Sequence, residues 1–402
     1  MAIIGGGAAG FFAAVNAARL HKGLRVVVLE KTDKLLAKVR ISGGGRCNVT
    51  HACFDPRELV KYYPRGQKEL AQLFARFSSG DTVAWFENRA VKLKTESDGR
   101  MFPVSDSSET IIDCLLQEAK RYGVEIRLKS GVNQLQVRDK GFVLQLDSGE
   151  IRAAKVLVAS GGHPKPEAYT WLADLGHRIV PPVPSLFTFN LPGNPIVKLM
   201  GVSVNGARIK LPDFKQEQIG PLLITHWGLS GPAIIKLSAM AARELAAAGY
   251  KYRVAINWVP EEDVDSLRSL LEDYRKYAPT AKVINRLEVA LPQRLKEWQL
   301  DRAGFSADQR WQDSSNKQIN RLIELLTNDQ YLASGKTTFK EEFVTSGGVD
   351  RRDIDFRSME SKVIPGLYFA GEVIDIDALT GGFNFQAAWS AGWAVAEAVT
   401  GQ

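Results

Sequence analysis

The hydrophobic pattern of the first thirty residues predicts a strand, a helix and a second strand. Apolar residues 2–4 run directly into Gly5-Gly6-Gly7-Ala8-Ala9-Gly10, and an alanine-rich, helix-compatible stretch follows at 11–18. A second β-branched strand, 25–29, ends on Glu30. Strand, glycine turn, helix, strand and terminal acid together form the dinucleotide-binding fingerprint. We therefore expect residues 1–30 to hold a dinucleotide.

Each glycine of this fingerprint has its own physical role. Gly5 allows the tight turn, Gly7 lets the backbone approach a pyrophosphate, and Gly10 lets the helix pack closely on the strand. The helix N-terminus offers unpaired N–H groups and a partial positive charge to the phosphates. Glu30 is placed to accept from ribose hydroxyls and would repel a ribose 2′-phosphate, which indicates FAD or NAD rather than NADP.

A second glycine-rich stretch, Ser42-Gly43-Gly44-Gly45-Arg46-Cys47-Asn48, follows this unit. Three consecutive glycines do not belong in a stable helix or strand interior. Such a loop presents backbone N–H groups to a ligand at close range, and its polar side chains add donors. A mobile surface loop is the alternative, and we favour the ligand interpretation because the loop directly follows the ribose-binding strand.

The remaining pattern predicts an α/β, Rossmann-like domain with an insertion. Residues 56–90 and 108–122 look helical, 124–151 alternates as strands, and 154–158 is a buried strand. Short β-segments begin after Leu186, a helical stretch follows at 261–333, and the α/β pattern resumes near 366. We predict one domain from 1–186 and 346–402, and an inserted domain at 187–345. Within the insertion we expect β-structure at 187–260 and 334–345 and a helical cap at 261–333.

Composition narrows the class of protein. The chain has 402 residues, 45% hydrophobic and 24% charged, with no run of eighteen apolar residues. The N-terminus enters the first strand directly and leaves no room for a signal peptide, so we expect a cytoplasmic protein without a membrane span. The cysteines Cys47, Cys53 and Cys114 form no metal-spaced cluster, and we expect neither a metal site nor a disulfide framework.

Positive charge is concentrated near the N-terminus. The net charge is +7, and residues 1–80 contain 13 Lys/Arg against 5 Asp/Glu. Arg57, Lys61, Arg65 and Lys68 follow a three-to-four spacing that predicts one face of a helix. This excess would suit a polyanion such as RNA, and a merely solvated basic surface is the alternative.

These stretches together resemble the BaiN/RdsA-type NAD(P)/FAD-dependent oxidoreductases of bacteria, over essentially the whole chain. The specific motifs are the 42–48 loop, Thr225-His226-Trp227-Gly228-Leu229-Ser230-Gly231-Pro232, Ser346-Gly347-Gly348-Val349, Met359-Glu360-Ser361-Lys362, and Gly371-Glu372 with Gly381-Gly382-Phe383-Asn384-Phe385-Gln386. Two positions depart from the family pattern: His163-Pro164-Lys165-Pro166 replaces a longer loop, and Arg40 stands where an apolar residue is usual.

The resemblance implies a two-dinucleotide-binding-type flavoprotein fold whose inserted domain is β-barrel-like and helical. It also implies FAD along Gly5, Gly7, Ala8, Ala9, Gly10, Glu30, Lys31, Ser42, Gly43, Gly44, Gly45, Arg46, Cys47, Asn48, Val132, Ala159, Ser160, Gly161, Gly162, Gly371, Glu372, Asp375, Gly382, Phe383, Asn384, Phe385 and Gln386. Family activities include reduction of uracil to dihydrouridine in large-subunit (23S) ribosomal RNA and of steroid-type enoyl substrates; relatives oxidise amines.

Reduction of an activated C=C bond needs a hydride and a proton, so a general acid must lie near the substrate. The candidate acids are Cys47, His163 and His226. No second GxGxxG is visible, so NAD(P)H would dock transiently over the flavin or another donor would reduce it. Three functions remain open: an FAD-dependent reductase, with ribosomal RNA preferred over a small molecule as substrate; an FAD oxidase of small amines; and a non-enzymatic flavin- or RNA-binding module.

Overall fold

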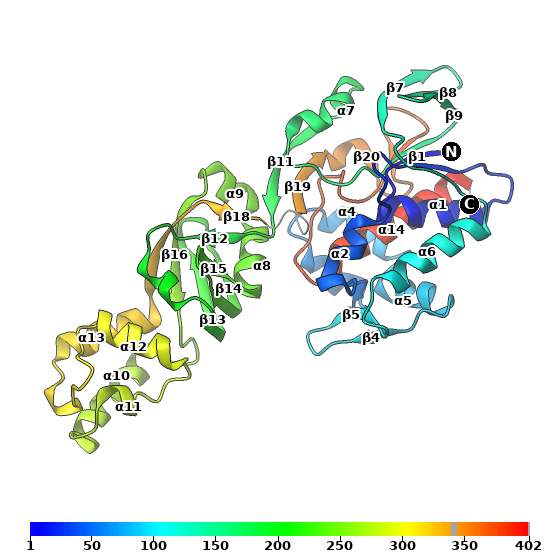
Figure 1. Cartoon of the computed structure of the whole chain (residues 1–402). Helices are drawn as coiled ribbons and strands as arrows, with labels where there is room; N and C mark the ends of the chain where they lie inside the picture. Colours follow the sequence, from blue (N-terminus) through cyan, green and yellow to red (C-terminus); the bar gives the residue numbers. More distant parts are fainter. Residues whose placement is uncertain (339–343, 401–402) are drawn as a thin grey trace. The chain divides into compact units, whose positions relative to one another are not determined.

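The computed structural model describes residues 1–338 and 344–400, which divide into two compact units (Figure 1). Unit 1 comprises Met1–Ser185 together with the chain after Thr338, and unit 2 comprises Leu186–Thr338. Each unit has its own cluster of buried apolar side chains. None of the helices in these described residues is both long and apolar enough to cross a membrane.

A seven-stranded sheet forms the centre of the described part of unit 1, in the order β20-β21-β22-β10-β1-β2-β6. Strands β22, β10, β1, β2 and β6 are parallel, and β20 and β21 extend the β22 edge in antiparallel pairing. The strands are β1 (Ala2–Ile4), β2 (Val27–Leu29), β6 (Glu125–Arg127), β10 (Val156–Val158), β20 (Ile354–Asp355), β21 (Glu360–Ser361) and β22 (Leu367–Phe369).

The strand order has a switch point between β1 and β10. From β1 the chain moves to β2 on one side, whereas β10 and β22 lie on the other. In open parallel sheets, ligands bind at the carboxyl ends of the strands beside such a point. The predicted α/β, Rossmann-like fold class is therefore confirmed.

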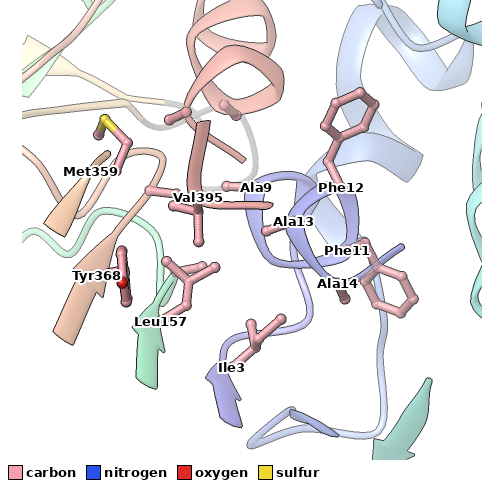
Figure 2. Packing of buried hydrophobic residues seen from close by; sticks show 14 of the residues in the cluster. Ile3, Ala9, Phe11, Phe12, Ala13, Ala14, Leu157, Met359, Tyr368 and Val395 are labelled. Atoms are coloured by element: carbon pink, nitrogen blue, oxygen red, sulfur yellow. The ribbon is translucent and has the colours of Figure 1, made fainter. Parts of the chain in front are cut away.

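Helices cover this sheet, and the first and last of them pack together. The helices of unit 1 are α1 (Ala8–Leu20), α2 (Ala37–Gly45), α3 (Pro56–Leu59), α4 (Gln67–Phe74), α5 (Ser79–Glu87), α6 (Glu109–Arg121), α7 (Thr170–Asp174) and α14 (Phe383–Thr400). Figure 2 shows Ala9 and Ala13 of α1 directed toward Val395 of α14. A Cβ atom on Gly392 of α14 would lie 2.9 Å from the Ala9 carbonyl oxygen, so small residues permit this close approach.

Three smaller sheets complete unit 1. A β-meander follows β6, a three-stranded sheet adjoins the 42–48 loop, and a two-stranded ribbon joins segments far apart in sequence. Their strands are β7 (Val132–Arg138), β8 (Gly141–Leu146) and β9 (Gly149–Ala153); β3 (Thr50–His51), β4 (Leu93–Thr95) and β5 (Arg100–Pro103); and β11 (Ile179–Ser185) with β19 (Val344–Val349).

Unit 2 consists of an antiparallel sheet and a group of helices. The sheet order is β17-β16-β13-β14-β15-β12-β18. Its strands are β12 (Thr188–Asn190), β13 (Ser203–Leu211), β14 (Gln216–Ile224), β15 (Gly228–Ser230), β16 (Lys251–Asn257), β17 (Asp329–Ser334) and β18 (Lys336–Thr337). Its helices are α8 (Pro232–Met240), α9 (Ala242–Ala247), α10 (Val264–Tyr277), α11 (Val283–Arg286), α12 (Gln293–Arg302) and α13 (Asn316–Thr327).

Several predicted element boundaries are wrong. The predicted helical stretch 56–90 is three separate helices, α3, α4 and α5. The predicted cap 261–333 ends too late, because residues from Asp329 onward pair with β16 as strand β17. Helices α8 and α9 interrupt the predicted β-structure 187–260. Strand β19 begins at Val344 and pairs with β11, so residues 344–345 belong to unit 1. Of the predicted β-segment 334–345, residues 339–343 lie outside the described residues.

Candidate dinucleotide site

The first glycine turn joins β1 to α1 as the fingerprint predicts. Gly5 has a φ of +114°, and a Cβ there would lie 2.3 Å from the Ala159 carbonyl oxygen. A Cβ on Gly10 would lie 2.1 Å from the Gly5 oxygen, so both positions require glycine for packing. A Cβ on Gly7, by contrast, would meet no described atom within 4 Å. Gly7 is the N-cap of α1, and the space beside it is open. This space, in front of unpaired helix N–H groups, fits a pyrophosphate.

Glu30 is fixed at the end of β2 with both carboxylate oxygens oriented. Its Oε2 accepts from the Gly6 N–H at 2.9 Å, and its Oε1 accepts from the Thr32 N–H at 2.8 Å. Each carboxylate oxygen can accept a second hydrogen bond. Glu30 therefore remains able to accept from ribose hydroxyls while its position is set by the backbone.

A cavity of about 220 Å³ lies beside Glu30. Its walls come from the ends of β1, β2 and β10, from the start of β7 and from α7 with the turn before it. The lining residues are Ile4, Gly5, Leu29, Glu30, Lys31, Gly131, Val132, Asn133, Gln134, Leu135, Ser160, Gly161, His163, Ala168, Tyr169, Trp171, Leu172 and Val373. The position of this cavity suits the adenosine half of a dinucleotide.

The 42–48 loop breaks the end of α2. The helical torsion angles fail at Ser42, Gly43 and Gly44, the two glycines having φ of 59° and 70°. Gly44 and Gly45 face open space, since a Cβ on either would meet no described atom within 4 Å. The backbone of this loop is therefore accessible to a ligand.

The side chains of this loop are less available than the sequence suggested. Arg46 donates to the Glu96 carboxylate at 2.6 Å and lies 4.0 Å above the Phe102 ring. In the amide orientation that satisfies both neighbours, Asn48 donates to the Thr50 carbonyl (3.0 Å) and accepts from the Gly382 N–H (2.9 Å), which ties the loop to the C-terminal glycine turn. Arg40, where the family pattern is apolar, pairs with Glu109 at 2.7 Å on the surface.

The C-terminal turn is held mainly by its own side chains. The Gln386 oxygen accepts from Thr50 (2.6 Å) and Thr82 (2.9 Å) in the interior, and Asn384 accepts from the Ala378 N–H at 3.0 Å. Phe383 stacks on Tyr62 with ring centroids 4.2 Å apart. The Phe385 ring stacks on the Trp389 ring. These side chains therefore fix the N-terminus of α14. Because they are engaged within the protein, the backbone N–H groups at the start of α14 are the groups available to a ligand.

Two acids follow β22, and they have different surroundings. Asp375 is buried and lies 3.6 Å from Arg351. Glu372 pairs with Lys38 of α2 at 2.5 Å and accepts from the Thr345 N–H at 2.8 Å. A Cβ on Gly162 would lie 2.4 Å from the Glu372 Oε1 atom. The turns after β10 and β22 thus meet at the switch point.

The structure places Cys47 and His163 in different parts of unit 1. Cys47 is fully buried, and desolvation raises the pKa of its thiol to about 12 although Ser42 hydrogen-bonds to it. A thiol that holds its proton so strongly is poorly matched to acid catalysis near neutral pH. His163 lines the cavity beside Glu30, and its Nδ1 accepts from the Lys165 N–H at 3.3 Å. The structure therefore associates His163 with the adenosine-sized cavity.

His226, the third candidate acid, belongs to unit 2. It is exposed in the turn between β14 and β15, and its ring lies edge-on to Trp227 at 4.4 Å. The Trp227 Nε1–H donates to Thr188 at 2.9 Å, which anchors this turn.

The predicted basic helix face does not exist. Arg57 lies in α3, Lys61 in a 3₁₀ turn and Lys68 in α4, while Arg65 is buried in an ion pair with Asp377. Of the 13 basic residues in 1–80, eight have acidic partners: Arg25, Lys38, Arg40, Arg46, Arg57, Lys61, Arg65 and Arg76. Six of these eight pair with acids outside residues 1–80, so acids elsewhere in unit 1 neutralise most of the local excess of charge, and this excess does not indicate an RNA-binding face.

Sequence reasoning missed several residues of the site. Tyr169, Trp171 and Gln134 line the cavity, and Thr345 contacts Glu372. The aromatic pair in 166–174, directly after the Gly161-Gly162 turn, was an available signal for Tyr169 and Trp171. No signal in the sequence marked Lys38, whose partner is 334 positions away.

Comparisons with known proteins agree with this geometry. Residues 1–398 match the family described as "HI0933-like protein Rossmann domain". The chain is 31% identical to the ribosomal RNA dihydrouridine synthase of Escherichia coli, covering 98% of this chain and 96% of that protein. It is 28% identical to the 3-dehydro-bile acid delta(4,6)-reductase of Clostridium scindens, covering 97% and 96% respectively.

A solved structure shares the fold. The 3-ketosteroid-delta4-(5alpha)-dehydrogenase of Rhodococcus jostii superposes with a TM-score of 0.52 at 13% identity, covering 100% of this chain and 96% of that one. Because the family match spans almost the whole chain, the protein belongs to the HI0933-like family. It is a flavin-dependent oxidoreductase, and its family and fold imply FAD as the cofactor, as the sequence motifs predicted.

Proposed function

We propose that this flavin-dependent oxidoreductase reduces a C=C bond, and that its substrate is uracil in 23S ribosomal RNA, which becomes dihydrouridine. The observation that carries the proposal is the near-complete alignment with a ribosomal RNA dihydrouridine synthase at 31% identity. A second protein of that name, from Haemophilus influenzae, is 28% identical over the whole chain. We place the reaction in the cytoplasm, with NAD(P)H as the electron donor.

The glycine turns of unit 1 suit FAD in an extended conformation along the switch point. In this proposal the pyrophosphate lies beside Gly7 and the N-terminus of α1, and the adenosine ribose lies against Glu30. The flavin half then extends past Gly162 and Glu372 toward the N-terminus of α14. Bound FAD would supply the hydride, and the chain would hold the cofactor and deliver a proton.

The three candidate proton donors lie in different surroundings. Burial and a raised pKa disfavour Cys47, and His163 lies at the adenosine side of the site. His226 is exposed on unit 2 and stays a prediction.

A reductase of a small enoyl substrate is the second candidate. The observation in its favour is the 28% identity with a bile acid reductase over 97% of this chain. Both candidates reduce a C=C bond conjugated to a carbonyl group, so the relatives agree on reaction type and differ in the size and charge of the substrate.

The decisive experiment supplies electrons chemically, so that the identity of the natural donor does not matter. FAD-loaded protein is reduced anaerobically with dithionite and mixed with unmodified 23S ribosomal RNA, and nucleosides are analysed by mass spectrometry. Formation of dihydrouridine at a discrete position supports the proposal. Turnover of a steroid-type enoyl ketone without dihydrouridine would transfer the assignment to the second candidate. Peroxide release from small amines in air would instead identify an oxidase. Repeating the productive reaction with NADH and NADPH then identifies the donor.

A further inference from the structure

Thr345 carries a buried polar side chain in unit 1. Thr345 lies on β19 opposite Pro184 of β11, and it is fully buried. Its backbone N–H donates to the Glu372 carboxylate at 2.8 Å, but its hydroxyl has no hydrogen-bond partner among the described residues. Buried hydroxyl groups are nearly always hydrogen-bonded, so this unpaired one, close to the glycine turn after β10, leaves a hydrogen bond that a ligand would complete.

The hydroxyl faces the switch point. A Cβ built on Gly162 would lie 2.7 Å from the Thr345 Oγ1 atom and 2.4 Å from the Glu372 Oε1 atom. Hydroxyl and carboxylate therefore lie side by side over the Cα atom of Gly162. Glu372 itself is held by Lys38 at 2.5 Å. Next to it, a Cβ on Gly371 would lie 3.0 Å from the Cβ of Ala9 in the first turn of α1.

The Thr345 hydroxyl and the Glu372 carboxylate together suit only one part of a dinucleotide cofactor. A carboxylate repels phosphate oxygens and accepts from hydroxyl groups, whereas a threonine hydroxyl can both donate and accept. A neutral polyol satisfies both side chains. In FAD the neutral polyol is the ribityl chain, which joins the pyrophosphate to the flavin ring.

We propose that the Thr345 hydroxyl, beside Glu372, binds a hydroxyl group of the ribityl chain of FAD. This inference rests on the FAD premise of the proposed function and is independent of the substrate. Thr345 is a cofactor-positioning residue whose hydrogen bond fixes the flavin half relative to β19.

The test compares FAD with ADP, which contains the adenosine and pyrophosphate but lacks the ribityl chain. Apo-protein of wild type, Thr345→Val and Thr345→Ser is titrated with each ligand by calorimetry. We expect Thr345→Val to weaken FAD about 2- to 12-fold, the equivalent of one hydrogen bond. ADP affinity should be unchanged, and Thr345→Ser should restore FAD binding. Equal loss for FAD and ADP, or no loss for either, would overturn the assignment.

Stability of the apo-protein separates a ligand contact from a structural one. Removing an unsatisfied hydroxyl costs the folded apo-protein no hydrogen bond, so Thr345→Val should leave its unfolding midpoint unchanged or raise it. The control is Thr188→Val in unit 2, whose buried hydroxyl accepts from Trp227 and donates to the Thr337 carbonyl. This control should lower the midpoint and leave FAD affinity intact. A lower midpoint for Thr345→Val would assign the hydroxyl to folding instead. Normal FAD binding in a protein that reduces no RNA would refute only the proposed substrate.

Discussion

Two buried polar clusters in this protein differ in how completely they are paired. In unit 2, Asp329 accepts from Trp258 (3.0 Å), Gln299 (2.9 Å), both Nη atoms of Arg302 (2.8 Å each) and Tyr331 (2.5 Å). In unit 1, the switch point contains the Thr345 hydroxyl, which has no partner within residues 1–338 and 344–400, and open space beside Gly7. The first cluster is complete without a ligand, and the second is not. Of these two clusters, the one with the unpaired hydroxyl and the open space is the one that we propose binds a ligand.

The largest expected effect is the loss of the complete cluster. Asp329→Ala should lower the free energy of unfolding by about 3–5 kcal/mol, because Arg302 would remain partly buried without its carboxylate. Urea denaturation with tryptophan fluorescence measures this change. The control Asp308→Ala removes an exposed partner of Lys282 and should have little effect. Similar losses of unfolding free energy in both variants would show that the buried Asp329 cluster stabilises the fold no more than an exposed ion pair does.

The incomplete cluster should respond in ligand affinity instead of stability. Gly7→Val fills the open space beside α1, where its φ of −93° tolerates a side chain. We expect FAD affinity to fall about 5- to 150-fold, the equivalent of 1–3 kcal/mol of overpacking, with the apo-protein folded. Gly23→Val is a matched control, because a Cβ there is also accommodated, 3.5 Å from His21. Released flavin, measured by absorbance, should drop only for Gly7→Val; equal retention by the two variants would contradict the proposed pyrophosphate position.

The smallest expected effect concerns a paired buried group of unit 1. It tests whether paired polar groups outside the crevice contribute to stability in unit 1 as they do in unit 2. His177 of unit 1 is buried, with its ring nitrogens 2.7 Å from the Ser361 hydroxyl and 3.3 Å from the Leu172 carbonyl. Burial lowers its pKa below the usual 6.5. The folded state therefore binds the proton less readily than the unfolded state, so stability is fully present above about pH 6.5 and declines as the pH falls below it.

The pH dependence of unfolding measures this contribution. Each unit by which the pKa of His177 is lowered corresponds to about 1.4 kcal/mol between the two protonation states. His177→Gln should flatten the profile below about pH 6.5. Identical pH profiles for wild type and His177→Gln would show that His177 does not contribute to the pH dependence of unfolding.

Local patterns in the sequence predicted the centre of the fold well. The strand, Gly5–Gly10 turn, helix and Glu30 lie within thirty residues, and their roles follow from backbone geometry that each residue type permits. The predicted interruption at Ser42–Gly45 appears as non-helical torsion angles for the same reason. Whether the individual residues bind FAD stays a prediction that the variants above test.

Features that depend on distant partners were not predictable in this way. Residues 329–334 have helix-like neighbours, yet they form β17 because β16 offers an edge to pair with. The spacing of Arg65 from its basic neighbours predicts an exposed helix face. Arg65 is instead buried in an ion pair with Asp377, 312 positions away. Gln386, which is predicted to contact FAD, accepts from Thr50 and Thr82 in the interior, and the sequence does not indicate these two partners. Spacing along the chain carries no information about such partners.

The packing of α1 on α14 joins the first and the last helix of unit 1, so unit 1 depends on a segment that is synthesised after unit 2. Strand β10 lies between β1 and β22, and the alanine face of α1 is covered by a helix that begins at Phe383. Domains generally fold as the chain leaves the ribosome. Unit 2, continuous from Leu186 to Thr338, has all its strands before the last strand of the main sheet is made. The cofactor crevice of unit 1 is therefore complete only after β22 and α14, which follow unit 2 in the chain, have been synthesised.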